Sequence, residues 1–117
     1  MLLILNSYVT NQYPVLSAVA LTDKHVVEMS LETCQMVSVI FSKWYYDWGT
    51  IPKKNGLPYS TEKGAFRNRP YIQWAANSHV NLTWLVRYGY ALCDEYRHRY
   101  EKDHACMKGL EVAANSF

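Results

Sequence analysis

The residues Asp23-Lys24-His25 and Glu32 are the first group whose types and spacing suit catalysis. Seven residues make nearly two turns of an α-helix, so His25 and Glu32 project from one face, about 10 Å apart along the axis. Met29 and Met36 share this face, and a carboxylate buried beside them has a raised pKa, as a general acid or base requires. The alternative is a structural carboxylate that is bonded to Asn77, Asn81 or Arg99.

A basic loop is the second such group. Between residues 49 and 69 a single acid, Glu62, stands against five cations, which are Lys53, Lys54, Lys63, Arg67 and Arg69. This segment therefore carries a charge of +4 in a chain whose net charge is +2, so the remaining residues sum to −2. Cationic side chains that are concentrated on an exposed loop favour phosphate-bearing ligands.

Aromatic residues precede this loop, and the start of a helix follows it. Residues 44–48 carry rings on which bases can stack. Pro70 is typical of the first turn of a helix, with Asn68 as its cap, and the free N–H groups at that end favour an anion. We therefore predict that nucleic acid or a nucleotide binds to Lys53, Lys54, Lys63, Arg67, Asn68, Arg69 and Trp48. The alternative is a solvated loop with ordinary lysines and core aromatic residues.

The run from Asp94 to Cys106 contains His98, His104 and Cys106, but their spacing matches no known metal site. A solvated helix face accounts for this run better. The motifs of phosphate-binding loops, dinucleotide-binding folds, serine esterases and zinc proteases are absent from the sequence. We expect no metal and no cofactor.

The elements that position these groups read as helices. From His25 to about Tyr46 the chain has no Gly or Pro and is apolar on nearly every side, which predicts a buried central helix at about 24–46. Shorter helices are expected at residues 14–21, 70–77, 78–102 and 105–114, and Thr22 or Asp23 is expected to cap the central one. The breakers Gly49, Pro52, Gly56, Pro58 and Gly64 make residues 47–69 a long loop. The sequence predicts an all-α fold.

Composition limits the architecture and the compartment. A chain of 117 residues, half of them hydrophobic, suits a single helical domain over residues 1–117. Cys34, Cys93 and Cys106 are an odd number without a C-x-x-C pair, which indicates free thiols in a reducing compartment. The apolar start of the chain is too short to span a bilayer and lacks the features of a signal peptide, so we expect no membrane association.

Residues along most of the chain resemble an uncharacterised family of small proteins from tailed bacteriophages. The likeness covers residues 5–106 and rests on Ser17-Ala18, Asp23-Lys24-His25, Glu32, Asn68-x-Pro70, Trp74, Leu92-Cys93-Asp94-Glu95-Tyr96 and Arg99-Tyr100. The chain is also distantly similar to the phage pyrimidine dimer DNA glycosylases, or endonuclease V. These compact all-α enzymes carry Asp-x-His on an early helix and a catalytic glutamate seven residues beyond the His, where this chain has Asp23, His25 and Glu32.

The resemblance implies a phage-encoded protein of the host cytoplasm that binds DNA or a nucleotide and acts as a DNA N-glycosylase/AP-lyase on a damaged or modified base. In the glycosylases an amino-terminal amine attacks the sugar C1′, a glutamate assists, and arginines hold the phosphates. By this resemblance Glu32 is the catalytic acid, Lys24 or the amino terminus the nucleophile, and His25 an orienting group. Arg69 replaces a histidine of some bacterial relatives and becomes a phosphate-binding residue. The alternative is a non-enzymatic phage protein that inhibits a host defence protein or sequesters a nucleotide signal.

Overall fold

The computed structural model describes residues 13–116, and within them the regular elements are helices. They are α2 (Pro14–Val19), α3 (Asp23–Phe41), the 3-10 helix η1 (Ser60–Lys63), α4 (Pro70–Ala76), α5 (His79–Tyr100) and α6 (Met107–Ala114). The β-pairing in this part of the chain is a single antiparallel bridge between Pro52 and Pro58. The predicted all-α fold is confirmed. Among the described helices, none combines the length and the apolar character that a membrane span needs.

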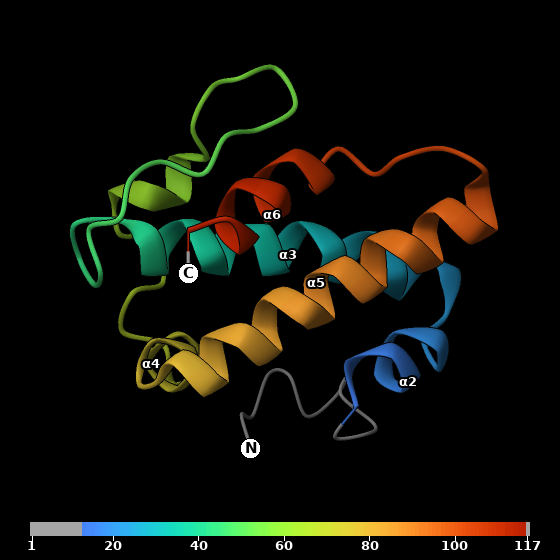
Figure 1. The fold of residues 1–117 in the computed structure, drawn as a ribbon, viewed down its shortest axis with the longest axis horizontal. Coiled ribbons are helices and arrows are strands. Elements are labelled where there is room, and N and C mark those ends of the chain that lie inside the picture. Colours follow the sequence, from blue (N-terminus) through green and yellow to red (C-terminus); the bar gives the residue numbers. More distant parts are fainter. Residues whose placement is uncertain (1–12, 117) are drawn as a thin grey trace.

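Helix α3 is the centre of the molecule. It packs against α5 along much of its length and also contacts η1, α4 and α6, whereas α2 rests on α5 (Figure 1). The second half of α3 is buried almost without interruption from Met36 to Phe41, as an all-round apolar helix requires. The prediction of a central helix with at least three others packed on it is confirmed.

The predicted end of the central helix near Tyr46 is wrong, because α3 stops at Phe41. Ser42 leaves the helical conformation, with its hydroxyl bonded to the Val39 carbonyl at 2.6 Å. The chain then folds back, so that the N–H of Tyr46 donates to the Ile40 carbonyl and the N–H of Trp48 to the Phe41 carbonyl. These bonds satisfy the last carbonyls of the helix in a turn, and the helix does not continue.

Capping residues decide the other helix boundaries. The Thr22 hydroxyl accepts the His25 N–H at 3.4 Å, and the Ser78 hydroxyl accepts the Asn81 N–H at 3.1 Å. Both are side-chain caps of the expected kind. The predicted cap at Asn68 is wrong, because Arg69 occupies the N-cap position of α4 without a side-chain cap bond, although Pro70 is in the first turn as predicted.

The segment between α3 and α4 is ordered by aromatic side chains. The Trp44 indole donates to the Lys63 carbonyl at 3.0 Å, the Tyr45 hydroxyl donates to the Arg67 carbonyl, and the Tyr46 hydroxyl donates to the Ala76 carbonyl. The rings that end the apolar run therefore fasten the loop and α4 to α3. The stretch around residues 53–58 projects from the body, as the green tip in Figure 1 shows.

Gly89 marks a close approach of α5 to its neighbours. A Cβ at this position would lie 2.8 Å from the Leu110 side chain and 2.9 Å from the Thr33 methyl group. We expect Gly89→Val to lower the free energy of unfolding by about 1–3 kcal/mol, because the added carbons overpack the junction of α3, α5 and α6. Thermal melting measures the loss. Arg87→Val, on the exposed side of the same helix, controls for the helix propensity of valine, and equal melting of the two variants would contradict this packing.

Candidate functional site

A pocket of about 260 Å³ opens between the exposed side of α3 and the start of α4. It is called the Glu32 pocket below. Its lining residues are Glu32, Gln35, Met36 and Val39 from α3, Phe66 and Arg69 from the segment that leads into α4, and Tyr71 and Ile72 from the first turn of α4. A carboxylate and a guanidinium thus face one hollow that is walled by aromatic and aliphatic groups, a combination typical of small-molecule and catalytic sites.

Glu32 is exposed on α3, so the prediction that it lies buried between methionines is wrong. Met29 and Met36 are buried, but Glu32 is turned toward solvent and the pocket. Partial burial in the pocket still raises the pKa of the Glu32 carboxyl above its usual range, and the Glu28 carboxylate raises it further. Glu32 is therefore easier to protonate than an ordinary surface carboxylate.

Glu32 has no hydrogen bond or ion pair with residues 13–116 in the structure. Two of its alternative structural partners are engaged elsewhere. Arg99 bonds to Glu95, Asp23 and two carbonyls, and the Asn81 amide donates to the Trp74 carbonyl at 2.8 Å. A structural carboxylate tied to Arg99 or Asn81 is thus ruled out.

Arg69 brings the cationic charge to this pocket. Its guanidinium lies over the Phe66 ring, 4.9 Å from the ring centre, and makes no ion pair within the described part of the chain. Burial raises the pKa of Tyr71, the Arg69 charge lowers it and Glu32 raises it, so these groups lie within electrostatic reach of one another. Arg69 is placed to receive an anion that enters beside Glu32.

Arg67 and Asn68 line a neighbouring shallow hollow of about 340 Å³, which Arg69 shares. The Arg67 guanidinium is already engaged. It lies 4.0 Å from the centre of the Trp44 ring and donates to the Gly64 carbonyl at 3.0 Å. Arg67 therefore supports the loop, and Arg69 is the more available of the two cations.

Lys24 and His25 do not line the Glu32 pocket. The Lys24 side chain is 78 % exposed, and its ammonium lies 3.9 Å from the Glu28 carboxylate. His25 is half-buried at the first turn of α3, about two helical turns from Glu32. The amino terminus, the other predicted nucleophile, lies outside the described residues. The catalytic roles of Lys24 and His25 stay predictions.

The remaining residues of the predicted binding surface lie in separate places. Lys53 and Lys54 line a larger hollow, and Lys63 lines another beside Asp47 and Glu62. Trp48 stacks on Tyr46, with ring centres 4.5 Å apart, so one of its faces is already covered. The cations of the basic loop thus lie on several separate surfaces, because the backbone of the loop wraps around the end of α3.

Gln35, Phe66 and Tyr71 belong to the Glu32 pocket and were not singled out from the sequence. For Gln35 a signal existed, because a residue three positions after Glu32 lies on the same helix face. For Phe66 and Tyr71 no local signal exists, since only the fold brings their segment to α3. Within residues 13–116 no three potential metal-binding side chains come together, including those of the run from Asp94 to Cys106.

The chain was compared with protein families, curated proteins and solved structures. The sequence model of the family described as pyrimidine dimer DNA glycosylase matches residues 6–108, a range that contains the Glu32 pocket and helices α2 to α5. No curated protein and no solved structure matches the chain. Because the family match extends over most of the sequence, and because the fold is helical as the resemblance implied, the chain belongs to the pyrimidine dimer DNA glycosylase family.

Proposed function

We propose that this protein binds DNA at the Glu32 pocket and removes a damaged or modified base as an N-glycosylase. The proposal rests on one observation, which is that Glu32 and Arg69 line the same pocket. Neither of them has an ion-pair partner among the described residues. Arg69 holds a backbone phosphate beside the pocket. Glu32 then stabilises the positive charge that develops at C1′ as the base leaves.

An amine completes the reaction in this proposal. Its nitrogen forms a bond to C1′ while the bond from C1′ to the base breaks, and the base leaves with the electron pair and takes up a proton. Glu32, whose pKa is raised by burial and by Glu28, receives and returns protons during the opening of the sugar. Lys24 or the amino terminus supplies the amine, and His25 orients the start of α3.

Borohydride trapping tests this chemistry. The protein is incubated with duplexes that contain an abasic site, a pyrimidine dimer or an alkylated base, and the Schiff base is reduced to a stable adduct. We expect an adduct with at least one duplex. If Lys24→Ala keeps the adduct, the amino terminus is the nucleophile. Absence of any adduct and of any base release would remove the enzymatic proposal. The phage origin and the host cytoplasm belong to the same proposal and rest on the sequence resemblance, whereas a host-protein partner belongs to the alternative of a non-enzymatic inhibitor.

The salt dependence of DNA affinity tests the DNA contact and distinguishes the roles of Arg67 and Arg69. Each phosphate contact that is lost lowers the slope of log affinity against log salt by about one unit. We expect Arg69→Ala to lower the slope by about one, and Arg67→Ala to change it less and to destabilise the loop, because Arg67 is held by Trp44 and Gly64. Titration of labelled duplex at several salt concentrations gives both slopes. A larger change for Arg67→Ala, or no binding by wild type at low salt, would contradict this assignment.

A further inference from the structure

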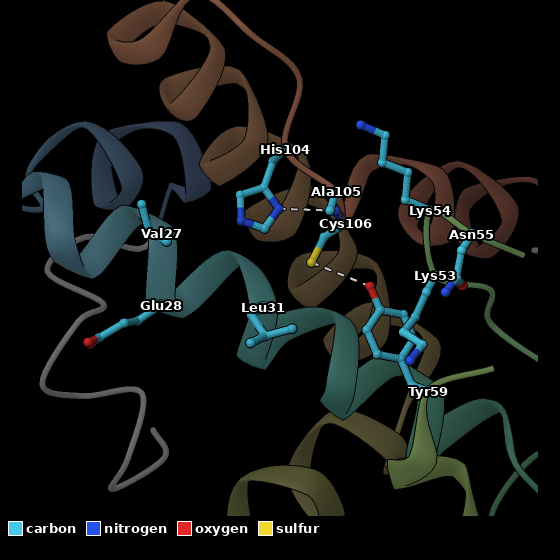
Figure 2. A pocket seen from close by; sticks show the side chains of 10 residues that line it. All are labelled: Val27, Glu28, Leu31, Lys53, Lys54, Asn55, Tyr59, His104, Ala105 and Cys106. Carbon is cyan, nitrogen blue, oxygen red and sulfur yellow. Dashed lines mark hydrogen bonds between the residues drawn. The ribbon is translucent and has the colours of Figure 1, made fainter. Parts of the chain in front are cut away.

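A second and larger pocket lies on the neighbouring side of α3, with a volume of about 600 Å³. Figure 2 shows that α3, the projecting loop and the segment before α6 all contribute to it. None of its lining residues belongs to the Glu32 pocket. Its volume is within the range of roughly 300–1,000 Å³ that is usual for pockets holding small organic ligands.

The walls of this large pocket are mainly apolar. Val27 and Leu31 are 37 % and 44 % exposed, which is unusual for two large aliphatic side chains one turn apart on a central helix. The buried Tyr59 ring lies opposite Leu31 (Figure 2), and its hydroxyl lies 3.4 Å from the Cys106 sulfur, to which it donates. These surfaces are suited to cover the two faces of a flat, apolar group.

The polar side chains at the edge of the large pocket are mostly hydrogen-bond donors. The His104 Nδ1 accepts the Cys106 N–H at 3.0 Å, so the neutral imidazole carries its proton on Nε2 as a donor. The Asn55 oxygen accepts the Leu57 N–H at 3.0 Å, which leaves the Asn55 amide nitrogen to donate. Lys53 and Lys54 add two ammonium groups that have no ion pair with any described residue.

Cationic charge is in excess around this pocket. The Glu28 carboxylate is offset by Lys24, whose ammonium lies 3.9 Å away. The Cys106 thiol at the base is 1 % exposed, and the neighbouring Cys34, His104 and Tyr59 side chains lower its pKa to about 5 against the effect of burial. Even with a Cys106 thiolate, Lys53 and Lys54 leave the mouth of the pocket positive. A ligand with hydrogen-bond acceptors and negative charge is complementary to this arrangement.

We propose that the large pocket binds a free nucleotide, with its base against Val27, Leu31 and Tyr59 and its phosphates at Lys53 and Lys54. A nucleotide combines a flat body, acceptor atoms at its edge and an anionic end, which are the three properties that the pocket selects. The site is separate from the Glu32 pocket, so the protein has a small-molecule site beside its proposed DNA site. The proposal does not depend on base removal.

Isothermal titration calorimetry with ADP, AMP, adenosine and oleate tests the site on the full chain. We expect ADP to bind and adenosine to bind about tenfold more weakly or worse, since it lacks the phosphates that Lys53 and Lys54 contact. Lys53→Ala and Lys54→Ala should each weaken ADP binding while leaving adenosine binding unchanged. Leu31→Asp should abolish binding of both, because a carboxylate then faces the base. Lys43→Ala, on an exposed lysine outside this pocket, is the matched control and should bind ADP as wild type does.

Three results would overturn the proposal. The first is no detectable heat with ADP or AMP at about 1 mM, the weak end of specific affinities. The second is binding of oleate without binding of ADP, which would make the pocket a site for apolar chains. The third is loss of ADP binding in Arg69→Ala, which would place the nucleotide in the Glu32 pocket, where Arg69 is the cation. ADP binding by the wild-type protein, together with an absence of base removal by the wild-type protein, would support this site and reject only the proposed glycosylase activity.

Discussion

Glu32→Gln is expected to reduce base removal by a factor of roughly 100 or more, as the loss of a group that moves protons in the transition state does. The substitution keeps the shape of the side chain and removes its charge. Because Glu32 is exposed and forms no hydrogen bond with the described residues, the glutamine leaves no partner unsatisfied. Single-turnover cleavage of a damaged duplex measures the loss. Glu111→Gln, the same change on the exposed side of α6, should retain wild-type activity.

Glu32→Gln should increase the free energy of unfolding at neutral pH, although it reduces activity. Burial and Glu28 raise the pKa of Glu32 in the folded state above its ordinary value of 4.5, so ionisation of this group opposes folding. The wild type therefore loses stability relative to the variant as pH rises through the folded pKa, and the difference vanishes below about pH 4.5. Urea titrations at pH 4 and pH 7 measure this. A variant that is clearly less stable than wild type at pH 7 would show that Glu32 is structural.

Arg99→Ala is expected to lower the free energy of unfolding by about 1.5–3 kcal/mol, the range for hydrogen bonds to a charged group. The Arg99 side chain is 18 % exposed and joins three helices. It donates to the Glu95 carboxylate on α5 at 2.7 Å, to Asp23 at the start of α3 at 3.1 Å, and to the Val19 and Leu21 carbonyls at the end of α2. Those carbonyls have lost their helical partners, so the guanidinium replaces a capping group.

Arg97→Ala is the matched control for this prediction. Arg97 also forms a short ion pair, 2.6 Å from Asp103, but the two side chains are 55 % and 66 % exposed. Exposed pairs contribute at most about 1 kcal/mol, because water screens the charges and both side chains lose freedom. Thermal and chemical unfolding of both variants should therefore differ strongly. If Arg97→Ala is as destabilising as Arg99→Ala, burial is not what gives the Arg99 contacts their energy.

The starts of the helices could be predicted from the sequence, because they depend on neighbouring residues. Thr22 and Ser78 cap α3 and α5 as serine and threonine do before an apolar periodic run, and Pro70 lies in the first turn of α4. Leu85, Tyr88 and Leu92 follow one another on α5 at helical spacing, and all three are buried. These features depend on residues within a few positions of one another, so periodicity and capping rules were sufficient.

Two features depended on tertiary contacts, and the sequence could not reveal them. The end of α3 is set by the backbone of residues 46–48 folding onto its last carbonyls. The difference between Arg67 and Arg69 arises because Trp44 lies under one guanidinium, whereas the other lies beside Phe66 at the Glu32 pocket. Two arginines with equal local sequence signals therefore have different surroundings.

The sequence by itself determined the helical class, the capped helix starts and the candidate acid Glu32. Capping hydrogen bonds and the 3.6-residue period depend on residues that are close together in the sequence. They are therefore the same wherever the helix lies in the fold. Only the tertiary structure decided that Glu32 faces solvent beside Arg69, and that Lys53 and Lys54 belong to a different pocket. Exposure, pKa and charge pairing are properties of the space around a side chain, and long-range packing creates that space.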